Sequence, residues 1–139
     1  MYFRMTTKPR TRELSDGDYE HLLEFRTGLR RFLRWSEEQA RTAGLTAAQH
    51  QLLLAVRGHP GRDAATVGDV AGSLLLRHHS ATELADRTVA AGWLRRVRDT
   101  DDHRVVRLEL TAGGRRTLAR LSALHLEELA QLRRGIPDA

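Results

Sequence analysis

Arginines alternate with apolar residues around an acidic turn in residues 93–111, and this stretch has the clearest potential for chemistry. Its letters, WLRRVRDTDDHRVVRLELT, form two short runs rich in valine, leucine and arginine, joined by the polar segment DTDDHR. Such runs around a turn predict a β-hairpin with basic strands. An extended guanidinium fits the narrow, negative minor groove of DNA, so Arg104 in the turn is a candidate DNA contact. The alternatives are a solvated turn arginine or an ion pair with Asp101 or Asp102.

A second polar group lies where residues 77–92, RHHSATELADRTVAAG, predict a helix. Side chains in the first turn of such a helix can reach base edges, and a helix N-terminus favours phosphate. The alternative is a solvated cap in which Ser80 satisfies free backbone amides. We expect this group as a whole to contact DNA: Arg77, His78, His79, Ser80 and Thr82.

No set of residues resembles an enzyme active site. The chain lacks a glycine-rich phosphate loop, a nucleophile elbow and paired carboxylates beside a histidine in a recognisable context. Asp101, Asp102 and His103 are adjacent, but they fall in a solvent-facing turn, where burial cannot tune a pKa. We therefore expect no catalytic residues and no cofactor.

Metal binding is the remaining chemistry to consider, because the chain has seven histidines and no cysteine. His78 and His79 are adjacent and diverge by about 100° on a helix, so they cannot readily share an ion. His21, His50 and His125 fall on three different predicted helices and could meet in a dimer interface. Packing or solvent is the expected environment of these three rings, and no metal site is predicted.

The charge of the chain suits an anionic partner without proving one. The 139 residues carry a formal charge of +5, but residues 62–110 contain eight arginines and eight carboxylates. The placement of individual arginines therefore decides the matter more than the total charge does. A winged-helix protein that has lost DNA binding and mediates protein contacts is the alternative that this neutrality leaves open.

The remaining elements read as helices. A long amphipathic helix is expected from about Asp18, capped by Ser15 or Asp16, to a stop near Gly44. Thr46 caps a strongly apolar helix that the loop of residues 57–64 ends, and Thr66 caps a short helix over TVGDVAGSLLL. Small residues there and in the next helix allow the close crossing of a helix-turn-helix. Thr111 caps a final helix.

The first and last helices carry more apolar surface than a small DNA-binding region can cover. Apolar side chains recur at three- and four-residue steps in the first helix, and at near-heptad spacing over residues 112–132. Exposed apolar stripes usually indicate association, and a twofold dimer matches a pseudo-palindromic DNA site. We therefore expect a homodimer.

The order helix, helix, helix-turn-helix, wing, helix resembles the MarR family of bacterial transcriptional regulators. The matching segments appear in the family's order and cover roughly residues 18–130. They are LTAAQHQLLLAV (45–56), TVGDVAGSL (66–74), the T-x-x-x-D-R pattern of Thr82, Asp86 and Arg87, AAGWLRR (90–96), DTDDHR (99–104) and LTAGG (110–114).

This resemblance implies a homodimer whose terminal helices pair and whose two heads bind adjacent major grooves of an operator duplex. It implies that Arg104 enters the minor groove and that Asp102 holds the wing in shape by accepting hydrogen bonds. Arg87 and Arg96, within the matching segments, complete the expected DNA contacts. It also implies a repressor that a small aromatic or anionic effector relieves. Three positions depart from the family's usual residues and lower the positive charge: Glu83, Thr100 and His103.

The expected architecture is mainly α with a small β-hairpin wing, a winged helix-turn-helix with N- and C-terminal dimerisation helices. Residues 1–14 are assigned to a flexible tail and residues 15–139 to one unit. In it, residues 15–44 and 112–134 form the dimerisation helices, and residues 45–111 form the winged DNA-binding region. No run of eighteen apolar residues and no apolar signal core occur, so no membrane contact is expected and the cytoplasm is the expected location.

Overall fold

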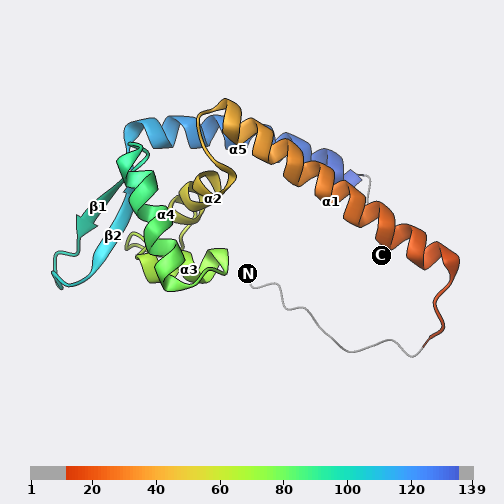
Figure 1. Ribbon diagram of the computed structural model, residues 1–139, viewed down its shortest axis with the longest axis horizontal. Coiled ribbons are helices and arrows are strands. Elements are labelled where there is room, and N and C mark those ends of the chain that lie inside the picture. Colours follow the sequence, from red (N-terminus) through yellow and green to blue (C-terminus); the bar gives the residue numbers. More distant parts are fainter. Residues whose placement is uncertain (1–11, 135–139) are drawn as a thin grey trace.

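Five helices and one β-hairpin make up the computed structural model, which describes residues 12–134 (Figure 1). The elements follow in the order α1 (Asp16–Thr42), α2 (Ala47–Arg57), α3 (Val67–Leu74), α4 (His78–Ala90), β1 (Leu94–Arg98), β2 (Val106–Leu110) and α5 (Ala112–Arg134). The predicted class, mainly α with a hairpin wing, is therefore confirmed. Most of the predicted tail, residues 1–11, lies outside the described residues.

Three helices begin at capping boxes, in which the side chains of two residues satisfy each other's backbone amides. The pairs are Ser15 with Asp18, Thr46 with Gln49, and Thr66 with Asp69. Thr46 and Thr66 are the predicted caps, and Ser15 is one of the two residues considered for α1. Each box accounts for amides that the first turn of a helix cannot pair internally.

The start of α5 is fixed against the base of the hairpin. Thr111 Oγ1 accepts a hydrogen bond from the backbone N–H of Gly114 at 3.1 Å and donates to the carbonyl of Gly92 at 2.7 Å. A Cβ atom at Gly114 would collide with the carbonyl of Trp93, so only glycine permits this approach. The base of the wing and the start of α5 are consequently held in a fixed relative position.

A single core joins α2, α3, α4, the hairpin and the inner end of α5. Val70 and Ala71 of α3 are buried, as are Leu84 and Ala85 of α4. The strands pair antiparallel from Leu94 with Leu110 to Arg98 with Val106. We call residues 45–111 the winged head.

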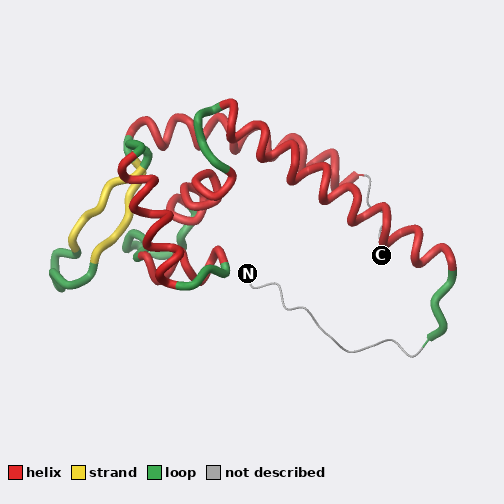
Figure 2. Tube along the Cα trace, in the orientation of Figure 1, coloured by secondary structure: helices red, strands yellow, loops and turns green. Residues whose placement is uncertain are grey.

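The helices α1 and α5 lie side by side and extend away from the winged head (Figures 1 and 2). Ala40 is the one residue of α1 that is buried, and it lies near the head. Large apolar side chains remain exposed along the rest of the pair: Tyr19, Leu22, Leu23, Phe25, Leu29, Leu33, Leu124, Leu126 and Leu129. Among residues 12–134 no helix has the length and apolar character needed to cross a membrane.

Candidate nucleic-acid interface

The turn between α3 and α4 gives α4 an open N-terminus. Leu75 takes a left-handed conformation with φ 55° and ψ 41°, and its side chain is 93% exposed. Arg77 occupies the cap position of α4 with extended backbone, and no side chain caps the helix. The alternative in which Ser80 caps the helix is wrong, because Ser80 is already inside α4. The first amides of α4 therefore have no side-chain partner and can receive an anion.

The predicted DNA contacts of α4 lie on its polar side. The opposite side packs into the core through residues that are at most 4% exposed, namely Ala81, Leu84, Ala85 and Thr88. Arg77, His78 and His79 are exposed, whereas Ser80 and Thr82 are half-buried. Two of the five already interact within the helix. The hydroxyl of Thr82 donates to the carbonyl of His78 at 3.0 Å, and His79 Nε2 lies 3.8 Å from a carboxylate oxygen of Glu83.

Arg87 and Arg96, the other arginines predicted near α4, have different surroundings. Arg87 is exposed in the last turn of α4, and no carboxylate of the described residues lies within salt-bridge distance of it. Arg96 of β1 forms an ion pair with Asp86 of α4. This pair connects the wing to α4, so Arg96 helps to set their relative position.

The tip of the wing is organised by Asp99, which the sequence analysis did not single out. One Asp99 oxygen accepts hydrogen bonds from the backbone amides of Asp101 and Asp102 at 3.1 and 2.9 Å, and the other accepts from Arg107 Nε at 2.8 Å. Arg107 also donates to the carbonyl of Ala64 at 2.7 Å. The hydrogen bond from Arg107 is the main reason why the pKa of Asp99 is lowered, and the amides of Asp102 and Asp101 add to it.

Arg104 at the wing tip is paired with Asp102. The Asp102 carboxylate accepts hydrogen bonds from the backbone N–H of Arg104 at 3.1 Å, from its Nε at 3.1 Å and from its outer guanidinium nitrogen at 3.3 Å. These bonds lower the pKa of Asp102. The side chain of Arg104 is 91% exposed. Solvent screens an ion pair this exposed, so Arg104 can leave Asp102 for another anionic partner at little cost.

Most of the carboxylates in residues 62–110 form local ion pairs, which explains how a segment of zero net charge can still contain unpaired arginines. Six of the eight carboxylates contact a basic side chain, in the pairs Asp69–His59, Glu83–His79, Asp86–Arg96, Asp99–Arg107, Asp102–Arg104 and Glu109–Arg95. Within the described part of the chain, Arg77, Arg87 and Arg98 have no carboxylate at salt-bridge distance. These three arginines therefore carry positive charge that no nearby carboxylate of the winged head offsets.

A cluster of aromatic and histidine rings joins the winged head to the long helices. The ring of His125 in α5 lies 4.8 Å from those of His50 in α2 and Trp35 in α1, and its Nε2 is 2.6 Å from Ser36 Oγ. Burial lowers the pKa of His50, and the nearby His125 adds to this.

Two of the three histidines considered for a dimer interface therefore meet within one protomer. His21 lies elsewhere, exposed in the N-terminal part of α1. Among residues 12–134, no three side chains of histidine or of acidic residues are grouped to hold a metal ion.

Comparisons with known proteins agree with this architecture. Residues 43–105 match the sequence profile of the MarR family. The structure is similar to the crystal structure of a MarR family transcription regulator, with a TM-score of 0.73 and 22% identity, covering 88% of this chain and 79% of that one. It is similar to AbsC, a MarR family transcriptional regulator from Streptomyces coelicolor, with a TM-score of 0.71 and 19% identity over 92% of this chain and 86% of that one.

A third similar structure is a mutant of MarR from E. coli complexed with operator DNA. Its TM-score is 0.67 and its identity 21%, covering 91% of this chain and 89% of that one. No curated protein matches the chain. At these identities the structural similarity concerns the fold, and the match of residues 43–105 concerns the family.

Proposed function

We propose that this chain, in which residues 43–105 match the MarR family, is a transcription regulator rather than an enzyme and binds duplex DNA sequence-specifically as a homodimer. One observation carries the proposal. The reading helix α4 is buried on one side, polar on the other, and open at its N-terminus, beside a wing whose tip carries an exposed arginine.

The polar side of α4 is the proposed element for the major groove. Ser80 and Thr82 are short polar residues that can bond base edges, and His78 and His79 flank them. Arg77 and the unpaired amides of the first turn would bind a phosphate, which fixes the position of the helix on the duplex. The carboxylate of Glu83 repels phosphate nearby, so Glu83 is expected to weaken DNA binding.

The wing is the proposed element for the minor groove. Hydrogen bonds of Asp99 with Arg107 and with the amide of Asp102 fix the conformation of the tip. The exposed Arg104 side chain would leave Asp102 and enter the minor groove, where the potential is negative. Asp102 keeps a structural role through the backbone N–H of Arg104. Arg87 is assigned to a phosphate, and Arg96 to positioning the wing through Asp86.

The homodimer is proposed from the apolar surface of α1 and α5. Leu22, Leu29 and Leu33 share one face of α1 by helical spacing, and 40% or more of each side chain is exposed. A second copy of the same helices would cover this stripe and bring two heads to neighbouring major grooves.

Regulation is proposed to be repression that a small aromatic or anionic effector relieves. The ring cluster around His125 lies where α2 of the winged head meets α1 and α5, so a ligand there would act on the angle between head and dimer. Such a ligand must prefer one head spacing, and its coupling to operator affinity is then reciprocal.

The test is fluorescence anisotropy with DNA from upstream of the protein's own gene, across a salt series and with competitor DNA. Specific binding predicts a steep salt dependence and a complex that outlasts the competitor. Absence of binding at low salt would instead favour a winged-helix protein that mediates protein contacts. Binding that competitor DNA abolishes would contradict sequence specificity.

A further inference from the structure

We propose that Arg57 and Arg115 form a binding site for a small oxyanion, a phosphate or a carboxylate, at the junction of α2, β2 and α5. Arg57 is the last residue of α2, and Arg115 lies in the first turns of α5. The site contains no residue of α4 or of the wing tip, and it does not depend on the DNA-binding proposal.

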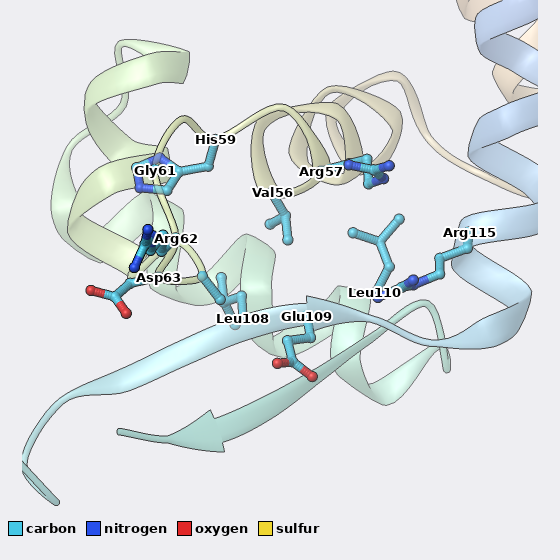
Figure 3. Close-up of a pocket in the computed structure, with 11 residues that line it drawn as sticks. Val56, Arg57, His59, Gly61, Arg62, Asp63, Leu108, Glu109, Leu110 and Arg115 are labelled. Carbon is cyan, nitrogen blue, oxygen red and sulfur yellow. The ribbon is translucent and has the colours of Figure 1, made fainter. Parts of the chain in front are cut away.

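A hollow of about 360 Å³ opens between the loop after α2, strand β2 and the start of α5 (Figure 3). Arg57 and Arg115 lie at one end of it, beside Val56 and Leu110, and the loop residues Arg62 and Asp63 lie at the other. A second hollow of about 350 Å³ is lined by the same two arginines together with Leu118 and Ser122. Both arginines therefore line both hollows.

The positive charge at this end of the hollow is not neutralised within the protein. No carboxylate of residues 12–134 lies within salt-bridge distance of Arg57 or Arg115. Glu109 of β2 also lines the hollow, but its carboxylate is directed away from Arg57 and Arg115 and binds Arg95 at 2.8 Å (Figure 3). Asp63 lies at the far end of the hollow.

Two guanidinium groups at the same end of a hollow, neither with a carboxylate partner, can both donate hydrogen bonds to one oxyanion. Arginine suits this role because its planar fork matches the paired oxygens of a phosphate or carboxylate. The anion would connect the end of α2 to the start of α5, next to the point where β2 runs through Thr111 into α5. Binding would thus stiffen the attachment of the wing to the long helix.

The experiment measures the Tm of the full chain, without DNA, against inorganic phosphate and separately against succinate, with sodium chloride at matched ionic strength as the reference. At ten times the Kd the Tm is expected to rise by roughly 4 °C or more above the chloride reference. The anion that raises the Tm more at equal concentration, phosphate or succinate, is the one that the site prefers. No rise with either anion beyond the chloride reference would overturn the proposal.

The variants locate the effect. Arg57→Gln combined with Arg115→Gln is expected to lose the rise, whereas Arg116→Gln, an exposed neighbour outside both hollows, is expected to keep it. If the double variant does not fold, the single Arg115→Gln variant is used, and it is also expected to lose the rise in Tm. An undiminished rise in the variants that lack Arg115 would also overturn the proposal. Since no DNA is present, failure here leaves the DNA-binding proposal untouched.

Discussion

The winged head and the two long helices differ in where their apolar side chains lie. In the head, residues such as Leu52, Leu53, Leu94 and Leu108 are at most 2% exposed and form one core. Along α1 and the outer part of α5, seven leucines are exposed by 40% or more, up to 68% at Leu126. The head is organised around one core, which also takes in Ala40 of α1 and Leu118 and Leu121 of α5, whereas the rest of the long helices exposes the apolar surface on which the proposed homodimer rests.

The largest expected effect follows from placing charge on the exposed stripe of α1. Leu22→Glu combined with Leu29→Glu would bury carboxylates in the proposed dimer interface, at a cost of roughly 3 kcal/mol or more. Sedimentation should show monomers, and operator affinity should fall at least 100-fold, since the dimer no longer presents two heads.

The matched control for this change is Arg31→Glu, at an exposed position on the opposite side of α1. It should leave the dimer intact. Unchanged sedimentation of the double variant, or a wild-type protein that is monomeric at micromolar concentration, would contradict the assignment of the long helices to dimerisation.

A smaller effect is expected at the wing tip. Arg104→Ala should weaken operator binding by roughly 1–3 kcal/mol, because it removes a cation from the minor groove and leaves the dimer unchanged. Anisotropy titration at moderate salt measures the loss. Arg133→Ala, near the end of α5, should bind as the wild type does. Equal affinities of Arg104→Ala and the wild type would assign Arg104 to a surface ion pair with Asp102.

The junction between the two regions should respond to pH through His50. Its pKa is lowered from 6.5, so the unfolded chain binds a proton below pH 6.5 before the folded chain does. The free energy of unfolding should therefore fall as the pH drops through 6.5 and level off below the lowered pKa. Urea denaturation between pH 5 and 8 measures the slope, and His50→Gln should reduce it. The same slope in both proteins would assign the pH dependence to other groups.

The smallest effect is expected at Leu75, in the turn before the reading helix. Its left-handed φ of 55° strains a leucine, and its 93% exposed side chain contributes almost no packing. Leu75→Gly removes the strain, at the entropy cost of a glycine, and should raise stability by about 0–1 kcal/mol. A higher urea midpoint would bear this out, and a loss above about 1 kcal/mol would indicate that Leu75 packs against something.

Local signals in the sequence were sufficient to predict most of the fold. Thr46, Thr66 and Thr111 each precede a helix and cap it as expected. Gly44, expected to stop the first helix, has a φ of +91° just after the helix ends at Thr42. The start of that helix is two residues earlier than expected, because Ser15 and Asp18 form the capping box.

Features that depend on contacts across the fold were not predicted. The role of Asp99 depends on the register of the hairpin, which pairs Arg107 with Val97 and so brings its guanidinium to Asp99. The hydrogen bonds that Asp99 accepts from the amides two and three residues later are a local turn signal that the sequence does contain. The pairing of Arg96 with Asp86 and the meeting of His50 with His125 likewise depend on how separate elements pack. Sequence spacing alone cannot supply those distances.

In the proposed homodimer, each protomer contributes one winged head and one pair of long helices, and the two heads bind one duplex from the same side. Selection of bound sequences from random duplexes tests it most directly. A dimer of this kind should enrich an inverted repeat whose half-sites lie about one helical turn, or 10–10.5 base pairs, apart. Enrichment of a single unrepeated half-site, or of no sequence at all, would contradict it.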